Sequence, residues 1–401
     1  GGGILLYNVS PKLIGLSIFN NTTTFDWPNR MGGGIYMTNS NPILTDVSIE
    51  NNSSWQGCGL FLNSSNPTLT NVKINNNYGN SGSSGGGGMY VNESSPILNN
   101  VLIKSNSASY GGGISLMSSS SILNDIRIEG NSATAGGGLR ISHSSLNITD
   151  AIIKGNSATE GGGIVIYGSS DNSSIISNVV IEGNIAEQGG GIHIEATVTN
   201  FTFSNVSIVG NSTIGNGLAP GAGISYYNTS SSPTFNNVNI IYNNGFGISI
   251  HGNNTPTISN VNIIGNEIGI RAKSGTNPTI LNSNILNNGY GLYNEGTLNI
   301  NTATNNYWGH TSGPYHPTQN PSGQGDSTNQ WVNVDPWLTA PNTDAPPIPA
   351  QNTTVTSTGN DFISLKWDTS PLGDLAGYKL YYDSDSSGYP YTNSVDIGTD
   401  T

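Results

Sequence analysis

A glycine motif recurs along most of this chain and constrains its fold more than any other feature. In its full form three glycines precede an aliphatic residue, and degenerate copies keep one or two of the glycines. The last glycine of each copy falls at positions 3, 34, 59, 88, 113, 138, 163, 191, 223, 247, 269 and 291, so the spacing is 22 to 32 residues. Repeats of about 20–50 residues are typical of solenoids, in which each repeat stacks on the next.

The residues between the glycines alternate between apolar and polar side chains. Residues 97–106 read ILNNVLIKSN and residues 122–131 read ILNDIRIEGN. Period two is the pattern of strands, and no window carries the period of a helix. Two-residue hairpin turns are missing, so we expect each strand to pair with its equivalent one repeat later. The sequence therefore predicts an all-β fold, a parallel β-helix of about twelve coils with an aliphatic core.

An asparagine recurs at one equivalent turn position of each repeat. Asparagine tolerates the left-handed backbone region, and its amide can bond to the same group one coil away. We therefore predict a structural asparagine ladder, with N-glycosylation of Asn-x-Ser/Thr triplets such as those at Asn8, Asn52, Asn63 and Asn211 as the alternative. The ladder is expected to include Asn52, Asn77, Asn106, Asn131, Asn156, Asn184 and Asn211.

Composition limits the classes of partner that the chain could bind and the cellular location that it suits. The chain has 24 acidic and 11 basic residues, a net charge of −13, which argues against nucleic acid as a partner. No apolar run is long enough for a membrane span, and the lone Cys58 excludes an internal disulfide. Low charge and a high content of Asn, Ser, Thr and Gly suit an extracellular or cell-surface location. Because a glycine triplet already stands at residue 1, we expect this sequence to be part of a longer secreted chain.

Two resemblances extend this prediction. Residues 301–340, with Trp308, Gly313, Pro314 and Trp337, resemble the C-terminal closing motif of many bacterial and archaeal right-handed parallel β-helix proteins. The glycine triplets resemble the repeats of chlamydial polymorphic outer-membrane proteins and similar adhesin-like surface proteins. The resemblances imply a right-handed, pectate-lyase-like β-helix over residues 1–340. One departure is that isoleucine mostly replaces the aromatic residue of the chlamydial repeat.

The rest of the chain has a different composition. Residues 341–350 form a proline-rich linker, and residues 351–401 resemble part of a fibronectin type III domain. The expected strands are Thr353–Ser357, Phe362–Trp367 and Gly377–Tyr382, with Trp367 and Tyr378 at that family's core positions. About 50 residues make only half of such a β-sandwich.

The residues that enzymes of this fold use are not assembled in the sequence. Hydrolysis needs paired carboxylates, and a lyase needs a calcium-binding acidic cluster with a basic residue. Asp46, Asp125 and Asp150 fall at a turn position that other repeats fill with asparagine. The five histidines are scattered, and Arg271 with Lys273 is the best basic pair, although exposure to solvent explains both. We therefore predict no catalytic, cofactor or metal site.

Two outward rows are the candidate surfaces. Tyr36, Phe61 and Tyr90 form an aromatic row that could bind a glycan or a protein, with cross-coil stacking as the alternative. A second row alternates in charge through Lys104, Glu129, Lys154 and Glu182. It continues as apolar residues that could contact a partner or be buried in the fold. These are Val209, Ile241, Ile264 and Leu286.

These observations predict a non-enzymatic, extracellular structural or adhesive protein without cofactors. Its expected partners are a glycan or cell-surface ligand, or further copies of itself stacked through the coil ends into a filament or surface layer. The alternative function is the binding or degradation of a polysaccharide by a lyase or hydrolase.

Overall fold

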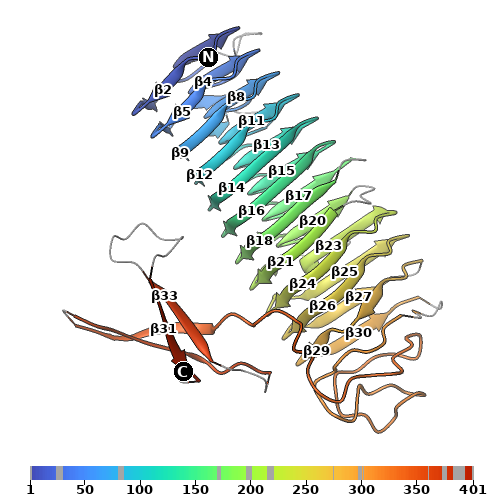
Figure 1. The fold of residues 1–401 in the computed structure, drawn as a ribbon. Coiled ribbons are helices and arrows are strands. Elements are labelled where there is room, and N and C mark those ends of the chain that lie inside the picture. The colour runs from blue at the N-terminus through green and yellow to red at the C-terminus, as the bar shows by residue number, and fades with distance from the viewer. Residues whose placement is uncertain are drawn as a thin grey trace. The chain divides into compact units, whose positions relative to one another are not determined.

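The computed structural model (Figure 1) is all β, and no helix occurs in the residues that it describes. The chain divides into two units, Gly1–Ala345 and Pro346–Thr401. The described residues are 2–23, 30–79, 85–168, 173–195, 201–214, 221–273, 275–296, 300, 302–359, 361–372, 377–382 and 393–399.

The first unit is a parallel β-solenoid whose strands stack in sequence order (Figure 1). The first sheet has twelve strands, one at each glycine motif. They are β1 (Ile4–Tyr7), β4 (Ile35–Thr38), β8 (Leu60–Asn63), β11 (Met89–Asn92), β13 (Ile114–Met117), β15 (Leu139–Ser142), β17 (Ile164–Tyr167), β20 (Ile192–Glu195), β23 (Gly221–Thr229), β25 (Phe246–Gly252), β27 (Ile268–Ala272) and β30 (Tyr290–Asn294).

The second sheet has fourteen strands and runs beside the first. Its main path is β2 (Lys12–Ile14), β5 (Ile43–Thr45), β9 (Thr68–Asn75), β12 (Ile97–Lys104), β14 (Ser120–Glu129), β16 (Ser145–Lys154), β18 (Ser174–Glu182), β21 (Phe201–Val209), β24 (Thr234–Ile241), β26 (Thr257–Ile264) and β28 (Thr279–Leu281), joined by β3 (Ser17–Phe19), β6 (Ser48–Glu50) and β29 (Asn284–Leu286). Two short pairs lie at the turns, β7 (Ser53–Ser54) with β10 (Tyr78–Gly79) and β19 (Ile185–Ala186) with β22 (Ser212–Thr213).

The solenoid amounts to about nine turns, slightly fewer than the twelve coils expected. The aliphatic side chains that alternate inward make one continuous core, and Ile114, Leu116, Val101 and Ile103 are each at most 1% exposed.

The glycine motif brings consecutive coils into close contact. Gly111 has a φ of +61°, which turns the chain into the strand. A Cβ on Gly112 would lie 2.4 Å from the Ser132 carbonyl oxygen, and one on Gly113 would lie 2.5 Å from that of Gly138. Cys58, which replaces a middle glycine, is fully buried, as expected for a small structural residue.

The asparagines form a hydrogen-bonded ladder through the interior. In a typical step, the backbone N and Nδ2 of Asn131 donate to Oδ1 of Asn156, at 2.9 and 3.0 Å. The seven asparagines predicted for the ladder are 0–1% exposed, so burial excludes glycosylation of Asn52 and Asn211. The bends within the second sheet carry another ladder, in which Asn100 (φ 51°) donates to Oδ1 of Asn71 at 2.8 Å.

The segment after the last coil closes the core. Trp308 is 0% exposed and packs in the core together with Val332 and Val334. Asp326 ends the asparagine ladder, because its Oδ2 accepts from the backbone N and Nδ2 of Asn288 at 3.0 and 2.8 Å. Burial raises the pKa of Asp326 to about 6, although the hydrogen bonds from Asn288 oppose the shift.

The described residues of the second unit form two antiparallel strand pairs. β31 (Gln351–Thr358) pairs with β32 (Ile363–Asp368), and β33 (Tyr378–Tyr382) pairs with β34 (Asn393–Gly398). Trp367 is 8% exposed, and its ring meets that of Tyr378 edge-on at 5.3 Å. The boundary between the units falls within the proline-rich segment 341–350.

Candidate functional site

The outer face of the first sheet carries the chemically most varied side chains of the solenoid. Its strands alternate, so that the residue two positions after the last glycine of each motif points away from the core and stands in register with its equivalents on the neighbouring coils. We call this line of residues the outer row. It consists of Tyr36, Phe61, Tyr90, Ser115, Arg140, Val165, His193, Ser225, Ser249 and Arg271.

Aromatic side chains begin the outer row. The Tyr36 and Phe61 rings stack at 5.1 Å, and the Phe61 and Tyr90 rings stack at 5.4 Å. Phe61 is only 5% exposed, because each face of its ring is covered by a neighbour. Binding a sugar by stacking needs a free ring face, so only the outer faces of the two tyrosines could serve. The arrangement favours cross-coil stacking over a glycan platform.

Arg140 lies farther along the outer row between two more aromatic rings. Its guanidinium carbon is 5.2 Å from the ring centre of Tyr110 and 5.4 Å from that of Tyr167. Burial lowers the pKa of Arg140, and the neighbouring tyrosines oppose this shift. The guanidinium therefore places one half-buried positive charge beside the next group of residues.

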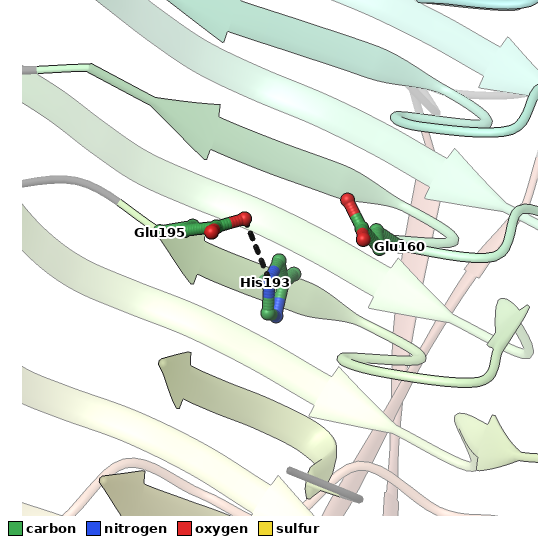
Figure 2. A group of neighbouring side chains, drawn as sticks. All are labelled: Glu160, His193 and Glu195. Atoms are coloured by element: carbon green, nitrogen blue, oxygen red, sulfur yellow. Dashed lines mark ion pairs between the residues drawn. The ribbon is translucent and has the colours of Figure 1, made fainter. Parts of the chain in front are cut away.

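Glu160, His193 and Glu195 meet on this face, as Figure 2 shows. One potential ligand atom from each of the three lies within 4.8 Å of those of the other two, and Nε2 of His193 is 3.9 Å from Oε2 of Glu195. His193 is 1% exposed, and its Nδ1 lies 3.3 Å from the Ser225 hydroxyl. A buried imidazole facing two carboxylates could hold a metal ion or take part in proton transfer.

The Tyr167 hydroxyl donates a hydrogen bond to Glu160 beside this group. The pKa of Tyr167 is raised far above its usual range, first by burial and then by the bond to Glu160 and the charges of Glu160 and Glu195. Arg140 opposes the shift. The phenol is therefore held in its neutral form, as a hydrogen-bond donor.

The sequence does not indicate the group of Glu160, His193 and Glu195, because its members are divided between two repeats and include a single histidine. Glu160 stands three residues before Gly163, and His193 stands two residues after Gly191. Aligning the two repeats on these glycines places the residues on neighbouring coils. The alignment does not show how the turn directs the Glu160 side chain, which only the three-dimensional structure decides.

The prediction of an apolar contact surface is wrong for three of its four residues. Ile241 and Ile264 are 0% exposed and Leu286 is 4% exposed, whereas Val209 is half-buried. The segment that follows the last coil lies on this end of the solenoid. A Cβ on Gly309 would lie 2.9 Å from Cβ of Leu286, for example. The alternative, burial within the fold, therefore holds for this end of the row.

The charged row and Arg271 of the basic pair are engaged in ion pairs. Lys104 lies 3.8 Å from Glu129, and Lys154 lies 3.2 Å from Glu182. The Arg271 guanidinium lies 2.6 Å from a carboxylate oxygen of Glu295. These contacts give the side chains a structural role between or along the coils.

The comparison with protein families agrees with this architecture. Residues 79–208 match the family described as right handed beta helix region, and this match supports a right-handed β-helix. The family covers both adhesive and polysaccharide-degrading proteins, so the match does not distinguish these functions. No curated protein sequence matches the chain. Among the described residues there is no helix with the length and apolar character needed to cross a bilayer.

Proposed function

We propose that this protein is an extracellular, non-enzymatic β-helix rod with a structural or adhesive role at a cell surface. The observation that carries the proposal is that outward side chains bind their equivalents on the neighbouring coils. Tyr36 stacks on Phe61, Asn100 donates to Asn71, and similar contacts recur along the rod. Side chains used in this way stabilise the stacking of coils and leave few groups free to converge on a substrate.

The proposal is tested by measuring whether the protein binds polysaccharides or cells without cleaving the polysaccharides. The purified full-length chain, coupled to beads, is measured for retention on immobilised polysaccharides and on whole cells. Reducing ends released from the same polysaccharides are measured in parallel, and sedimentation velocity reports self-association. We expect retention or self-association with no release of reducing ends. A chain that neither binds nor self-associates would contradict the proposal, and so would measurable depolymerisation.

Polysaccharide hydrolysis is the second candidate, and one observation favours it. A carboxylate oxygen of Glu160 and one of Glu195 lie within 4.8 Å of each other on neighbouring coils. Carboxyl groups about 5–5.5 Å apart are typical of retaining glycosidases, in which one acts as nucleophile and the other as acid. In such a reaction the hydrogen bond from Tyr167 would assign different roles to the two groups.

The two carboxylates give the second candidate a direct test. If the protein hydrolyses a polysaccharide, Glu160→Gln and Glu195→Gln should each abolish the release of reducing ends. Glu182→Gln is the matched control, because Glu182 lies on the second sheet and pairs with Lys154. Equal activity in all three variants would place any hydrolysis elsewhere.

A further inference from the structure

The residues around Val165 are arranged differently from the rest of the outer row. Val165 is a small side chain between the larger Arg140 and His193, and it is 0% exposed because its neighbours cover it. Glu160 comes from the turn before the strand, and Tyr167 lies two residues beyond Val165. The hydrogen bond from the Tyr167 hydroxyl to Glu160 therefore passes over Val165.

The glycine turn directs Glu160 toward this position. Gly161 has a φ of +61°, and a Cβ placed there would lie 2.7 Å from Cβ of Val165, so the turn is pressed against the outer row. On the next coil, His193 and Glu195 are two residues apart in β20 and so point to the same face. Three side chains with metal-binding atoms are thereby brought together from two coils.

His193 is held in the orientation that a metal ligand needs. Metal-binding histidines almost always bind a hydrogen-bonding group through their other ring nitrogen, which fixes the tautomer and the ring. Nδ1 of His193 has the Ser225 hydroxyl at 3.3 Å, and Nε2 faces Glu195 at 3.9 Å. With Nδ1 protonated, a nitrogen lone pair and a carboxylate oxygen face each other. A cation between them would remove that repulsion.

We propose that Glu160, His193 and Glu195 bind a divalent transition-metal ion of the zinc class. Carboxylate and imidazole ligands of zinc stand about 2.0–2.2 Å from the metal, which places tetrahedral ligand atoms about 3.4 Å apart. The present separations are 3.9 Å for the His193–Glu195 pair and at most 4.8 Å within the group. Small rotations of the two glutamates close this difference, because Glu195 is 40% exposed and Glu160 is half-buried.

The ligand set selects the class of ion. Calcium and magnesium take oxygen ligands, whereas an imidazole nitrogen with two carboxylates suits zinc, cobalt or nickel. The two carboxylates balance the charge of a divalent ion, and three protein ligands leave one position for water. Gln188 stands next to Glu160 on the following coil, and its buried Oε1 has no hydrogen-bond partner among the described residues. A metal-bound water would supply the missing donor.

This site goes beyond the structural and adhesive function, and its test is independent of any activity. The full-length chain is stripped of metal with EDTA and titrated calorimetrically with Zn²⁺ and separately with Ca²⁺. We expect one Zn²⁺ per chain and no binding of Ca²⁺. Cobalt substitution, followed by visible absorption, reports the ligand geometry.

Variants locate the ion. Glu195→Gln should lower the affinity for Zn²⁺ by at least about 100-fold, and Ser225→Ala, which acts through His193, by about 10–100-fold. Glu182→Gln serves as the control for a surface carboxylate and should leave the affinity unchanged. Circular dichroism in EDTA shows whether each variant is folded. Absence of Zn²⁺ binding by the unaltered chain would overturn the proposal, as would binding that survives Glu195→Gln undiminished.

Discussion

Replacing Asn131 by alanine tests the asparagine ladder at its centre. The side chain is 0% exposed and takes part in four hydrogen bonds. Its Oδ1 accepts from the backbone N and Nδ2 of Asn106, at 2.9 and 3.0 Å. Its Nδ2 donates to the Ile103 carbonyl and to Oδ1 of Asn156, both at 3.0 Å.

Alanine removes all four bonds of the Asn131 side chain. A typical intramolecular hydrogen bond contributes about 0.5–1.5 kcal/mol net, so the loss in free energy of unfolding is about 2–6 kcal/mol. Nδ2 of Asn106 keeps its bond to the Ile74 carbonyl at 2.8 Å, but the backbone N–H of Asn106 loses its acceptor inside the fold. A buried donor without an acceptor costs about 1–3 kcal/mol, which places the expected loss in the upper part of the range.

The matched control is Asn124→Ala. Asn124 is half-buried in the second sheet, and among the described residues its side chain bonds to Asn99 and Thr149, at 3.0 and 2.9 Å. Water can replace these partners, so we expect a loss of about 1 kcal/mol or less. Urea unfolding followed by circular dichroism compares the variants, and hydrogen exchange at the Asn106 amide reports the local effect. Equal losses in both variants would refute the reasoning that the buried ladder stabilises the rod.

Further predictions concern the end of the ladder, the glycines and the thiol. The pKa of Asp326 is about 6 when folded and about 3.8 otherwise, so its proton stabilises the fold below about pH 4 and this contribution is lost as the pH rises to 6. Asp326→Asn should remove this dependence and stabilise the protein at pH 7.5 by up to about 3 kcal/mol; an unchanged pH profile in urea melts would contradict it. Gly113→Ala places a Cβ 2.5 Å from the next coil's backbone and should cost several times more stability than Gly155→Ala. The latter, at φ +62° with no atom within 4 Å, should cost about 1–2 kcal/mol, and thermal melts with equal shifts would count against the close-contact argument. The Cys58 thiol is fully buried with its pKa raised to about 11, so a thiol reagent at pH 8 should label it only after unfolding; rapid labelling of the native chain would show the burial to be wrong.

The parts of the fold that were predictable are those that repeat. Alternation placed Ile114 and Leu116 in the core, and the recurring asparagine placed Asn131 in a ladder, because the same position returns on each coil in the same environment. Because the pattern is repeated many times, a departure in one repeat does not hide the position of the core or ladder residue in the others. At Leu286 a later segment contributes to the burial, since a Cβ on Gly309 would lie 2.9 Å from Cβ of Leu286, and the repeat pattern does not place that segment.

The sequence by itself determined the architecture: an all-β parallel solenoid with its core and its ladders. These follow from periodicity, since residues one repeat apart must meet when coils stack about 4.8 Å apart. The segment that closes the core was predicted only from its resemblance to known closing motifs. Only the tertiary structure decided which outward side chains converge. Glu160, His193 and Glu195 meet because a glycine turn with positive φ directs one of them across a small valine, and because their side chains are long enough to reach one another. Register along the chain fixes which residues are neighbours, whereas turn geometry and side-chain rotation fix which neighbours form a site.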